Sequence, residues 1–235
     1  MFNWITDLIF PYRCIACNKY LDHEYLCQRC FNALPIKKQY ECVGCKRPTP
    51  LGKTCVFCRD VCAVDQLLVV SDFKNHTVAS AIKLFKYRFL QDLAQPLSQL
   101  SFKYLDHLAK HNHFSIVRDN PLLVFVPLHK SREYWRGFNQ AELLARLIAR
   151  HYRLDVSAEL IRTTHRISQV ELKDRPERLS NVRGLYVCKD PELFRGKNII
   201  LIDDVCTTGA TLNECARVLK DAGAASVTAL AIARG

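Results

Sequence analysis

Short apolar runs recur along the chain from about residue 64 onward and indicate buried strands. They are rich in valine, leucine and isoleucine, and each has the length of an ordinary strand. The four runs are DQLLVVSDF (65–73), LLVFVP (122–127), IILI (199–202) and SVTALAIA (226–233). Because their hydrophobicity is continuous rather than alternating, we expect these strands to be covered on both faces.

Between these runs, apolar residues recur at intervals of three and four, which predicts amphipathic helices. In 76–89 the stripe consists of Val78, Ala81, Ile82, Phe85 and Phe89, and a second helix is expected at about 91–111. Two later stripes consist of Leu143, Leu144, Leu147 and Ile148, and of Leu212, Cys215, Ala216 and Leu219. Asn139 and Glu142 have the spacing of a capping box, Gly223 is expected to end the last helix, and 128–140 is expected to be a loop.

Strands that alternate with helices predict right-handed βαβ units and a mostly parallel sheet flanked by helices. We therefore expect an α/β domain over residues 64–235 and a small separate domain over residues 1–63. The chain of 235 residues is long enough for both. The first residues, MFNWITDLIFPY, are expected to form a short helix that packs on the body through Trp4, Leu8, Ile9 and Phe10.

Eight of the twelve cysteines form four CxxC pairs near the N-terminus. The pairs are Cys14/Cys17, Cys27/Cys30, Cys42/Cys45 and Cys55/Cys58. The last two pairs repeat the first two at an offset of 28 residues, so each half reads C-x2-C-x9-C-x2-C. The unit of this internal repeat supplies four thiolates, which is the number that a tetrahedral structural zinc needs.

Two sequential zinc ribbons, one in each half, are the simplest arrangement. The alternatives are a cross-braced arrangement, in which the first and third pairs share a zinc, and iron–sulfur ligation. A metal is expected because about sixty residues with this much polar content cannot bury a sufficient core. Four thiolates leave no open coordination position, so the predicted zincs are structural rather than catalytic. Cys62 lies outside the repeat and is expected to be an ordinary buried residue.

The chain is basic, with 34 Lys and Arg against 23 Asp and Glu and a formal net charge of +11. A well-solvated surface would explain this excess, and so would an anionic partner such as a phosphorylated ligand or a nucleic acid. No run approaches the roughly 18–20 apolar residues that span a bilayer, and the start lacks the features of a signal peptide. We therefore expect a cytoplasmic protein without a membrane segment, in which metal binding is favoured over disulfides.

The segment IILIDDVCTTGATL (199–212) contains the most specific chemistry. A strand-loop-helix unit places its loop at the carboxyl end of a sheet, where ligands bind in open α/β folds. Gly209 permits a close ligand approach, and the amides that begin a helix favour an anion. Asp203 and Asp204 would accept hydrogen bonds from neutral hydroxyls. A phosphate beside a diol describes a ribose 5-phosphate, and the alternative is a plain strand-turn-helix with an acidic N-cap.

IILIDDVCTTGAT resembles the thirteen-residue phosphoribosyl pyrophosphate (PRPP) motif of type I phosphoribosyltransferases. The resemblance implies that Asp203 and Asp204 bind the ribose hydroxyls and act catalytically, by orienting the ribose and favouring positive charge at its C1. It further implies that the 5-phosphate is bound by Thr207, Thr208, Gly209, Ala210 and Thr211. Magnesium is expected to accompany PRPP. Cys206 occupies a variable position of the motif, and we expect it to pack rather than react.

Further motifs extend the resemblance over nearly the whole chain. The CxxC pairs, KLFKYR, VPLHKSREYWRGFNQAELLA, SQVELKDRPERLSNVRG and the PRPP motif together are similar to the ComF/GntX family of competence-associated proteins. This resemblance implies a type I phosphoribosyltransferase-like fold with an N-terminal double zinc ribbon. It also implies a role in natural transformation, in which internalised single-stranded DNA is handled in the cytoplasm, and other competence or recombination proteins as partners.

By order along the chain, the segment after 122–127 corresponds to the pyrophosphate-binding loop of the transferases. Its candidates are Leu128, His129 and Lys130, and the counter-charges for pyrophosphate are Lys130, Arg132 and Arg136. For each base the alternative is a solvated surface side chain. Residues 162–183 correspond to the loop that closes over the ligand, and phosphates or DNA are the expected contacts of Arg162, Arg166, Arg175, Arg178 and Arg183.

Two functional hypotheses follow. The first is a DNA-handling competence factor whose PRPP site is active or regulatory, with the ribbons and the basic face binding single-stranded DNA through charge and aromatic stacking. The second is a magnesium- and PRPP-dependent phosphoribosyltransferase with an unidentified acceptor. Residues 64–120, where an acceptor hood is expected, contain no nucleobase-recognition motif that we identify.

Overall fold

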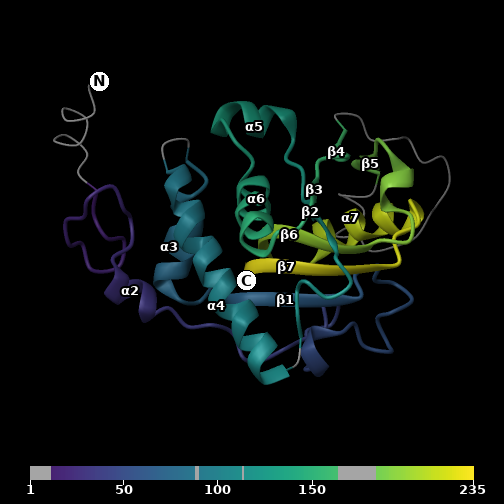
Figure 1. Ribbon diagram of the computed structural model, residues 1–235, viewed down its shortest axis with the longest axis horizontal. Helices are drawn as coiled ribbons and strands as arrows, with labels where there is room; N and C mark the ends of the chain where they lie inside the picture. The colour runs from purple at the N-terminus through teal and green to yellow at the C-terminus, as the bar shows by residue number, and fades with distance from the viewer. Residues whose placement is uncertain (1–11, 88–89, 113, 164–183) are drawn as a thin grey trace.

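The computed structural model describes residues 12–87, 90–112, 114–163 and 184–235 (Figure 1). Within these residues, five strands form one parallel sheet in the order β1-β7-β6-β2-β3. The strands are β1 (Gln66–Asp72), β2 (Leu122–Phe125), β3 (Val156–Ser157), β6 (Asn198–Cys206) and β7 (Ser226–Arg234). The predicted parallel α/β sheet is therefore confirmed. The predicted N-terminal helix, with Trp4, Leu8, Ile9 and Phe10, lies outside the described residues.

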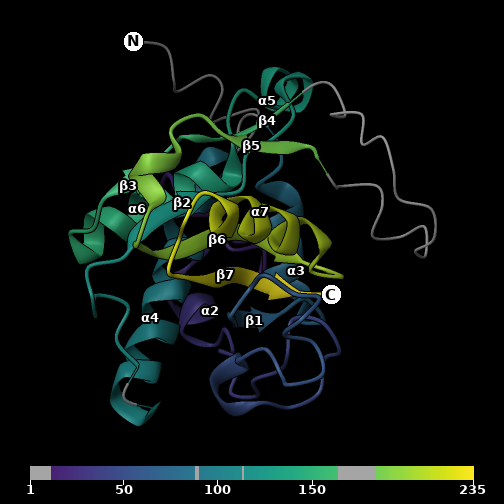
Figure 2. The same ribbon diagram turned by 90° about the vertical axis from the view of Figure 1, so that its right-hand side faces the viewer.

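The predicted helices are present and cover the sheet. They are α3 (His76–Leu84), α4 (Ala94–Asn112), α6 (Gln140–Tyr152) and α7 (Ala210–Asp221), with 3-10 turns at η2 (Gln91–Leu93) and η3 (Pro191–Phe194). Because parallel crossovers are right-handed, the strand order places α4 and α6 on one face of the sheet and α7 on the other. In Figure 2, α7 lies apart from the α4–α6 pair. The apolar stripe of α7 is buried in a continuous core, and that of α6 is buried at Leu144 and Ile148 and half-buried at Leu143 and Leu147.

The structure confirms two of the predicted helix ends, the start of α6 and the end of α7, and contradicts the predicted end of α3. Asn139 caps α6, because its side chain accepts hydrogen bonds from the amides of Ala141 and Glu142. Gly223 follows the end of α7 with a φ of +93°. In contrast, α3 ends at Leu84 rather than at residue 89. Phe85, directly after the last helical residue, is still fully buried. Phe89, the last residue of the predicted stripe, lies outside the described residues.

The segment that we expected to be a loop, 128–140, contains helix α5 (Lys130–Arg136). His129 caps its start by accepting from the amide of Ser131, and Gly137 ends it with a φ of +82°. None of its residues is buried. The prediction was wrong because a helix without an apolar stripe gives no periodic signal in the sequence.

A short antiparallel hairpin lies beside the sheet and also escaped prediction. It consists of β4 (Leu160–Arg162) and β5 (Tyr186–Cys188), which are too short for a strand pattern to be recognised. The hairpin brackets the predicted closing loop. Residues 164–183 of that loop, with Arg166, Arg175, Arg178 and Arg183, lie outside the described residues, whereas Arg162 is the last residue of β4.

The cysteine-rich segment crosses the free edge of β1. It contains α2 (Gln28–Asn32) and η1 (Pro50–Gly52). The amide of Lys37 donates to the carbonyl of Val70, and the Ser71 hydroxyl donates to the carbonyl of Pro35. This cover protects an edge strand that would otherwise present unpaired backbone groups. Because the apolar core continues from this segment into the sheet, a domain boundary at residue 63 stays a prediction.

None of the helices in the described part of the chain combines the length and the apolar character needed to cross a lipid bilayer.

Candidate functional site

The carboxyl edge of the sheet brings the two predicted binding loops together. β2 and β6 pair in parallel with Phe125 opposite Ile202, so both strands leave the sheet at the same edge. Asp203 and Asp204 lie within β6, directly after Ile202, and the predicted pyrophosphate loop follows β2 after Val126 and Pro127. The sequence-predicted site residues from these two segments therefore share one edge, as ligand-binding loops do in open α/β sheets.

The two acids are held by a backbone hydrogen bond and a lysine. Oδ1 of Asp203 accepts from the amide of Asp204 at 2.8 Å, and Oδ2 of Asp204 lies 3.3 Å from Nζ of Lys86. Burial, followed by the charge of Asp204, raises the pKa of Asp203 well above its ordinary value, and Lys86 acts in the opposite direction. The pair thus carries a surplus of negative charge that a ligand with hydroxyl donors or a divalent cation would relieve.

Lys86 is a site residue to which the sequence analysis assigned no role. It follows α3 in the turn that ends that helix, far from the acids in sequence. The motif KLFKYR, which contains Lys86, is one of the segments that carry the family resemblance. That motif was the signal that could have identified it.

The loop between β6 and α7 has the backbone of an anion site. Gly209 precedes α7 with a φ of +81°, a conformation that favours glycine. It has no side chain with which to cap the helix, so the amides of Thr211 and Leu212 receive no capping hydrogen bond from it. Thr207 and Thr208 are exposed beside them. The hydroxyl of Thr208 accepts from the amide of Ala210 at 3.3 Å, which orients it within the loop.

The residues of the predicted pyrophosphate loop differ in their exposure and in whether their side chains are already hydrogen-bonded. Leu128 is half-buried, and the His129 ring caps α5, with Nδ1 2.7 Å from the Ser131 hydroxyl. Lys130 and Arg132 are exposed on the first turn of α5. All three candidates thus lie at the carboxyl edge of the sheet, but the imidazole of His129 is engaged by its own helix.

Arg136 is the most constrained of the predicted counter-charges. Its Nη1 donates to Oε1 of Gln140 at 2.9 Å, and its buried Nε has no hydrogen-bond partner among the described residues. Burial lowers the pKa of this guanidinium, the charge of Asp204 raises it, and Arg132 lowers it. The charge of Asp204 therefore acts on the Arg136 guanidinium, and the N–H group at Nε of Arg136 is a buried donor that the described residues leave without an acceptor.

Exposed aromatic side chains lie next to this edge. Tyr134 and Trp135 of α5 are 85% and 66% exposed, and Tyr87 is 55% exposed. The rings of Tyr87 and Trp135 are 6.5 Å apart at 58°. Tyr87 adjoins Lys86, which contacts Asp204. We call Tyr87, Tyr134 and Trp135 the aromatic surface; the sequence analysis did not single it out, because α5 was not predicted.

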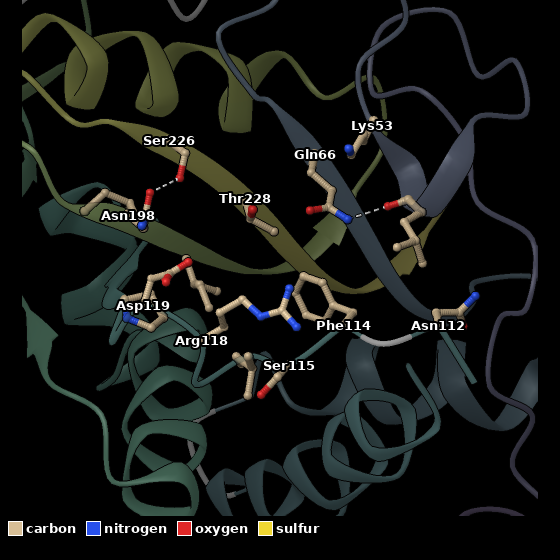
Figure 3. Close-up of a pocket in the computed structure, with 15 residues that line it drawn as sticks. Lys53, Gln66, Asn112, Phe114, Ser115, Arg118, Asp119, Asn198, Ser226 and Thr228 are labelled. Atoms are coloured by element: carbon tan, nitrogen blue, oxygen red, sulfur yellow. Dashed lines mark hydrogen bonds between the residues drawn. The ribbon is translucent and has the colours of Figure 1, made fainter. Parts of the chain in front are cut away.

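A cavity of about 390 Å³ opens at the opposite edge of the sheet (Figure 3). Gln66, Asn198 and Ser226, which line it, are the first residues of β1, β6 and β7. Lys53 and Arg118 also line it, and Figure 3 shows the Arg118 side chain extending along it. None of the residues predicted for ligand binding belongs to its lining, so this cavity is separate from the acid pair.

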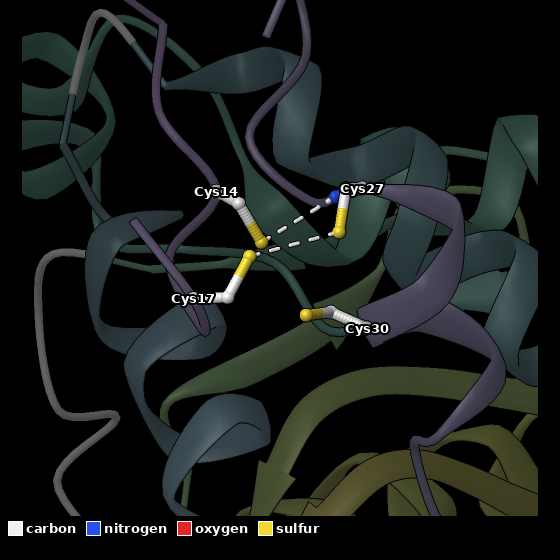
Figure 4. Close-up of side chains that lie close together, drawn as sticks. All are labelled: Cys14, Cys17, Cys27 and Cys30. Carbon is white, nitrogen blue, oxygen red and sulfur yellow. Dashed lines mark hydrogen bonds between the residues drawn. The ribbon is translucent and has the colours of Figure 1, made fainter. Parts of the chain in front are cut away.

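The eight repeat cysteines form two clusters, and Figure 4 shows the first. One consists of Cys14, Cys17, Cys27 and Cys30, and the other of Cys42, Cys45, Cys55 and Cys58. Within each cluster all sulfurs lie within 4.8 Å of one another. The Sγ atoms of Cys17 and Cys27 are 3.8 Å apart, and those of Cys45 and Cys55 are 3.6 Å apart. Tetrahedral zinc with bonds of about 2.3 Å places its sulfurs about 3.8 Å apart, so both clusters fit zinc.

The grouping is sequential, one cluster per half of the repeat, and not cross-braced. Equivalent amides support equivalent sulfurs, because Cys27 donates to Sγ of Cys14 and Cys55 donates to Sγ of Cys42. Burial opposes ionisation of Cys14 and Cys42, but such N–H donors outweigh it and lower the pKa of each thiol to about 6. Thiolates are the form that binds zinc.

Two cysteines outside the clusters were given specific expectations. Cys206 is buried, as expected for a packing residue, and burial raises the pKa of its thiol. Cys62 is only half-buried and follows the second cluster, with its amide donating to the carbonyl of Cys58. It is therefore not the ordinary core residue that we expected.

Comparison with known proteins identifies both regions of the chain. Residues 5–62 match the double zinc ribbon domain, and residues 136–235 match the phosphoribosyl transferase domain. Competence protein ComFC of Bacillus subtilis is 31% identical over 221 residues, which cover 90% of this chain and 85% of that protein. Competence protein F of Haemophilus influenzae is 26% identical over 94% of this chain and 90% of its own length. DNA utilization protein YhgH of Escherichia coli is 27% identical over 72% of each chain.

Proposed function

The chain belongs to the ComF family of competence-associated proteins, and on that premise we propose that it binds PRPP and handles internalised single-stranded DNA in the cytoplasm during natural transformation. Membership rests on the similarity to ComFC over most of both chains and on the two matched domains. The relatives are named for competence and for DNA utilization, which is the basis for the proposed process.

The observation that carries PRPP binding is the pairing of two acids and an uncapped helix start at the end of β6. In the proposed complex, Asp203 and Asp204 accept hydrogen bonds from the two neutral ribose hydroxyls. The amides and hydroxyls of Thr207, Thr208, Gly209, Ala210 and Thr211 bind the 5-phosphate. Sugar and phosphate are thus bound by adjacent parts of one loop, and this geometry suits a ribose 5-phosphate.

The pyrophosphate is assigned to the end of β2 and to α5. It carries the magnesium, which supplies charge neutralisation between the phosphates. Leu128, His129 and Lys130 begin the segment that would hold it, and Arg132 and Arg136 add cations from the same helix. The unpaired Nε of Arg136 supports this assignment, because a buried guanidinium donor without a partner is expected to find one in the ligand.

Binding of single-stranded DNA is supported by the aromatic surface together with the charge around it. Tyr87, Tyr134 and Trp135 offer exposed rings on which bases can stack, and Lys130 and Arg132 lie on the same helix as two of them. Aromatic stacking combined with cations is how sequence-tolerant proteins bind single strands. The aromatic surface adjoins the acid pair through Lys86, so DNA and PRPP would occupy one edge of the molecule.

Phosphoribosyl transfer is the second candidate function, favoured by the two acids at the position of the ribose. Pyrophosphate would leave C1 as an acceptor atom bonds to it, and Asp203 and Asp204 would stabilise the positive charge that develops there. The acceptor is not identified. Release of pyrophosphate from PRPP and magnesium in the presence of a panel of bases and amines tests this candidate. If no member of the panel causes pyrophosphate release, this candidate function is ruled out.

Two binding measurements test the main proposal. Titration calorimetry with PRPP and magnesium should give one site per chain. Fluorescence anisotropy with a labelled single-stranded oligonucleotide should give binding that weakens steeply as salt is raised. Failure to bind DNA even at low salt would eliminate direct DNA handling, and failure to bind PRPP would eliminate the assignment of the acid pair.

A further inference from the structure

The second zinc cluster is built into the wall of the phosphate loop. Val43 lies between two of its ligands, Cys42 and Cys45, and is 1% exposed. Its side chain packs on Gly209, since a Cβ on that glycine would lie 2.9 Å from Cγ2 of Val43 and 3.4 Å from its carbonyl oxygen. The backbone of the predicted phosphate site thus rests on the turn that a zinc ion would hold.

A buried arginine fixes the same turn from the sheet side. Arg234, near the end of β7, is 4% exposed and donates to the carbonyls of Cys42 at 3.2 Å and Val43 at 2.8 Å. Its Nη1 also lies 3.3 Å from Oε1 of Glu41. Arg234 pairs with Cys206 of β6 in the sheet, so it connects the zinc-binding turn to the strand that carries the acids.

The other side of the phosphate loop is tied to the end of the second ribbon. Asn213, in the first turn of α7, accepts from the amide of Ala63 at 2.6 Å and donates to the carbonyl of Val61 at 3.4 Å. Figure 2 shows the end of β7 above the dark blue loops of this ribbon. Both flanks of the loop 207–211 are therefore attached to residues at or just after the second cluster.

The internal repeat supplies a direct comparison with the first cluster. Ile15 is the counterpart of Val43 at the offset of 28 residues, and it is only partly buried. The contacts of the first ribbon with the body are elsewhere, for example from Lys103 of α4 to the carbonyls of Asn32 and Leu34. The two clusters are alike in ligands but differ in what they support.

From this asymmetry we infer that the second zinc site, and not the first, positions the phosphate loop, so that zinc held there sets the affinity for PRPP. The inference rests on the proposed PRPP binding. Val43 and Arg234 are positioning residues rather than ligand contacts. Val43 packs on Gly209 of the phosphate loop, and Arg234 donates to the backbone of the zinc-binding turn that contains Val43. Loss of zinc would free the Cys42–Cys45 turn, leave the buried Arg234 without its carbonyl partners, and release the backbone of Gly209.

The repeat provides a matched pair of variants, Cys45→Ser for the second cluster and Cys17→Ser for the first. Zinc content and PRPP affinity are measured on the full chain, and each variant should retain one zinc in place of two. We expect Cys45→Ser to weaken PRPP binding at least tenfold and Cys17→Ser to leave it within about twofold. Equal effects of the two variants would overturn the inference.

A second variant separates positioning from a general loss of folding. Arg234→Gln removes the guanidinium donors but no zinc ligand, and Lys103→Gln removes the ammonium donor that contacts the first ribbon. Arg234→Gln should keep two zincs and weaken PRPP binding severalfold, while Lys103→Gln should keep both properties. Unchanged affinity in Arg234→Gln would count against positioning through this residue.

Hydrogen exchange of the amides 207–213, measured without PRPP, keeps the inference distinct from the proposed function. Exchange should rise in Cys45→Ser and stay at the wild-type level in Cys17→Ser. If the wild-type protein binds no PRPP, the proposed function fails, and the exchange comparison still decides whether the second zinc site orders the loop. Identical exchange in both variants would overturn the coupling itself.

Discussion

Lys86 forms an ion pair with Asp204, with 3.3 Å between Nζ and Oδ2, and this contact joins the end of α3 to the acid pair on β6. It neutralises part of the charge that the two adjacent carboxylates accumulate. It also places a cation beside the acids that we propose bind the ribose of PRPP, and it brings the neighbouring Tyr87 close to the same edge.

Replacing Lys86 with alanine should weaken PRPP binding and hardly change stability. The lysine contributes attraction for a highly charged anion, and we expect roughly a tenfold loss of affinity, whereas a half-exposed ion pair stabilises the fold by about 0–1 kcal/mol. Titration calorimetry and urea unfolding measure the two effects. Lys83→Ala, one turn earlier in α3, is the control. Undiminished affinity in the Lys86 variant would remove this residue from the site.

Asp203→Asn should abolish PRPP binding while stabilising the unliganded protein. The pKa of Asp203 in the folded protein is raised above its unfolded value, so the stabilising effect of its protonated form is complete below the unfolded pKa of about 4 and is lost as the pH rises through the folded pKa. Asparagine retains the oxygen that accepts from Asp204 and never ionises.

The stability gain from Asp203→Asn should therefore be small near pH 4 and grow to the order of 1 kcal/mol near pH 8. Urea unfolding of both proteins across this range measures it. A difference between the two proteins that is the same at every pH would show that ionisation of Asp203 carries no such cost.

Two zincs per chain are expected from elemental analysis of the purified protein. Chelation should unfold the cysteine-rich segment, because four-thiolate sites supply much of the folding free energy of such small units. Circular dichroism and protease sensitivity before and after chelation would follow the loss. A metal content of zero or one, or iron in place of zinc, would contradict the assignment of both clusters.

Trp135→Ala and Tyr134→Ala should each weaken binding of single-stranded DNA. Stacking of one base on one ring contributes about 1–3 kcal/mol, which corresponds to a loss of roughly 5- to 150-fold. Phe57→Ala is the matched comparison, since Phe57 is an equally exposed ring, at 77%, on the second ribbon. A loss confined to Phe57→Ala would move the DNA site from α5 to the ribbons, where the sequence alone first suggested it.

Much of the fold follows from the sequence, because buried strands and amphipathic helices leave local patterns. The runs at 122–127 and 199–202 became β2 and β6, and the stripe of Leu212, Cys215 and Leu219 became the buried face of α7. Helix α5 left no pattern because none of its residues is buried. Because α5 was not predicted, the aromatic surface could not be placed from the sequence either.

Contacts between distant segments could not be predicted in the same way. The cysteine spacing predicts two zinc clusters, but it carries no information on what each cluster packs against. That Val43 rests on Gly209 while its repeat counterpart Ile15 does not is a consequence of how the whole segment wraps the sheet edge. The ion pair between Lys86 and Asp204 depends likewise on the register of β6 and on where α3 ends.

The most direct measurement is a calorimetric titration of the wild-type protein and of Asp204→Ala with PRPP and magnesium, with the zinc content of both samples determined. Wild-type protein should bind one PRPP per chain, and Asp204→Ala should keep both zincs and lose the binding. PRPP binding of normal affinity by Asp204→Ala, or none by the fully zinc-loaded wild-type protein, would contradict the assignment of IILIDDVCTTGATL as the PRPP site.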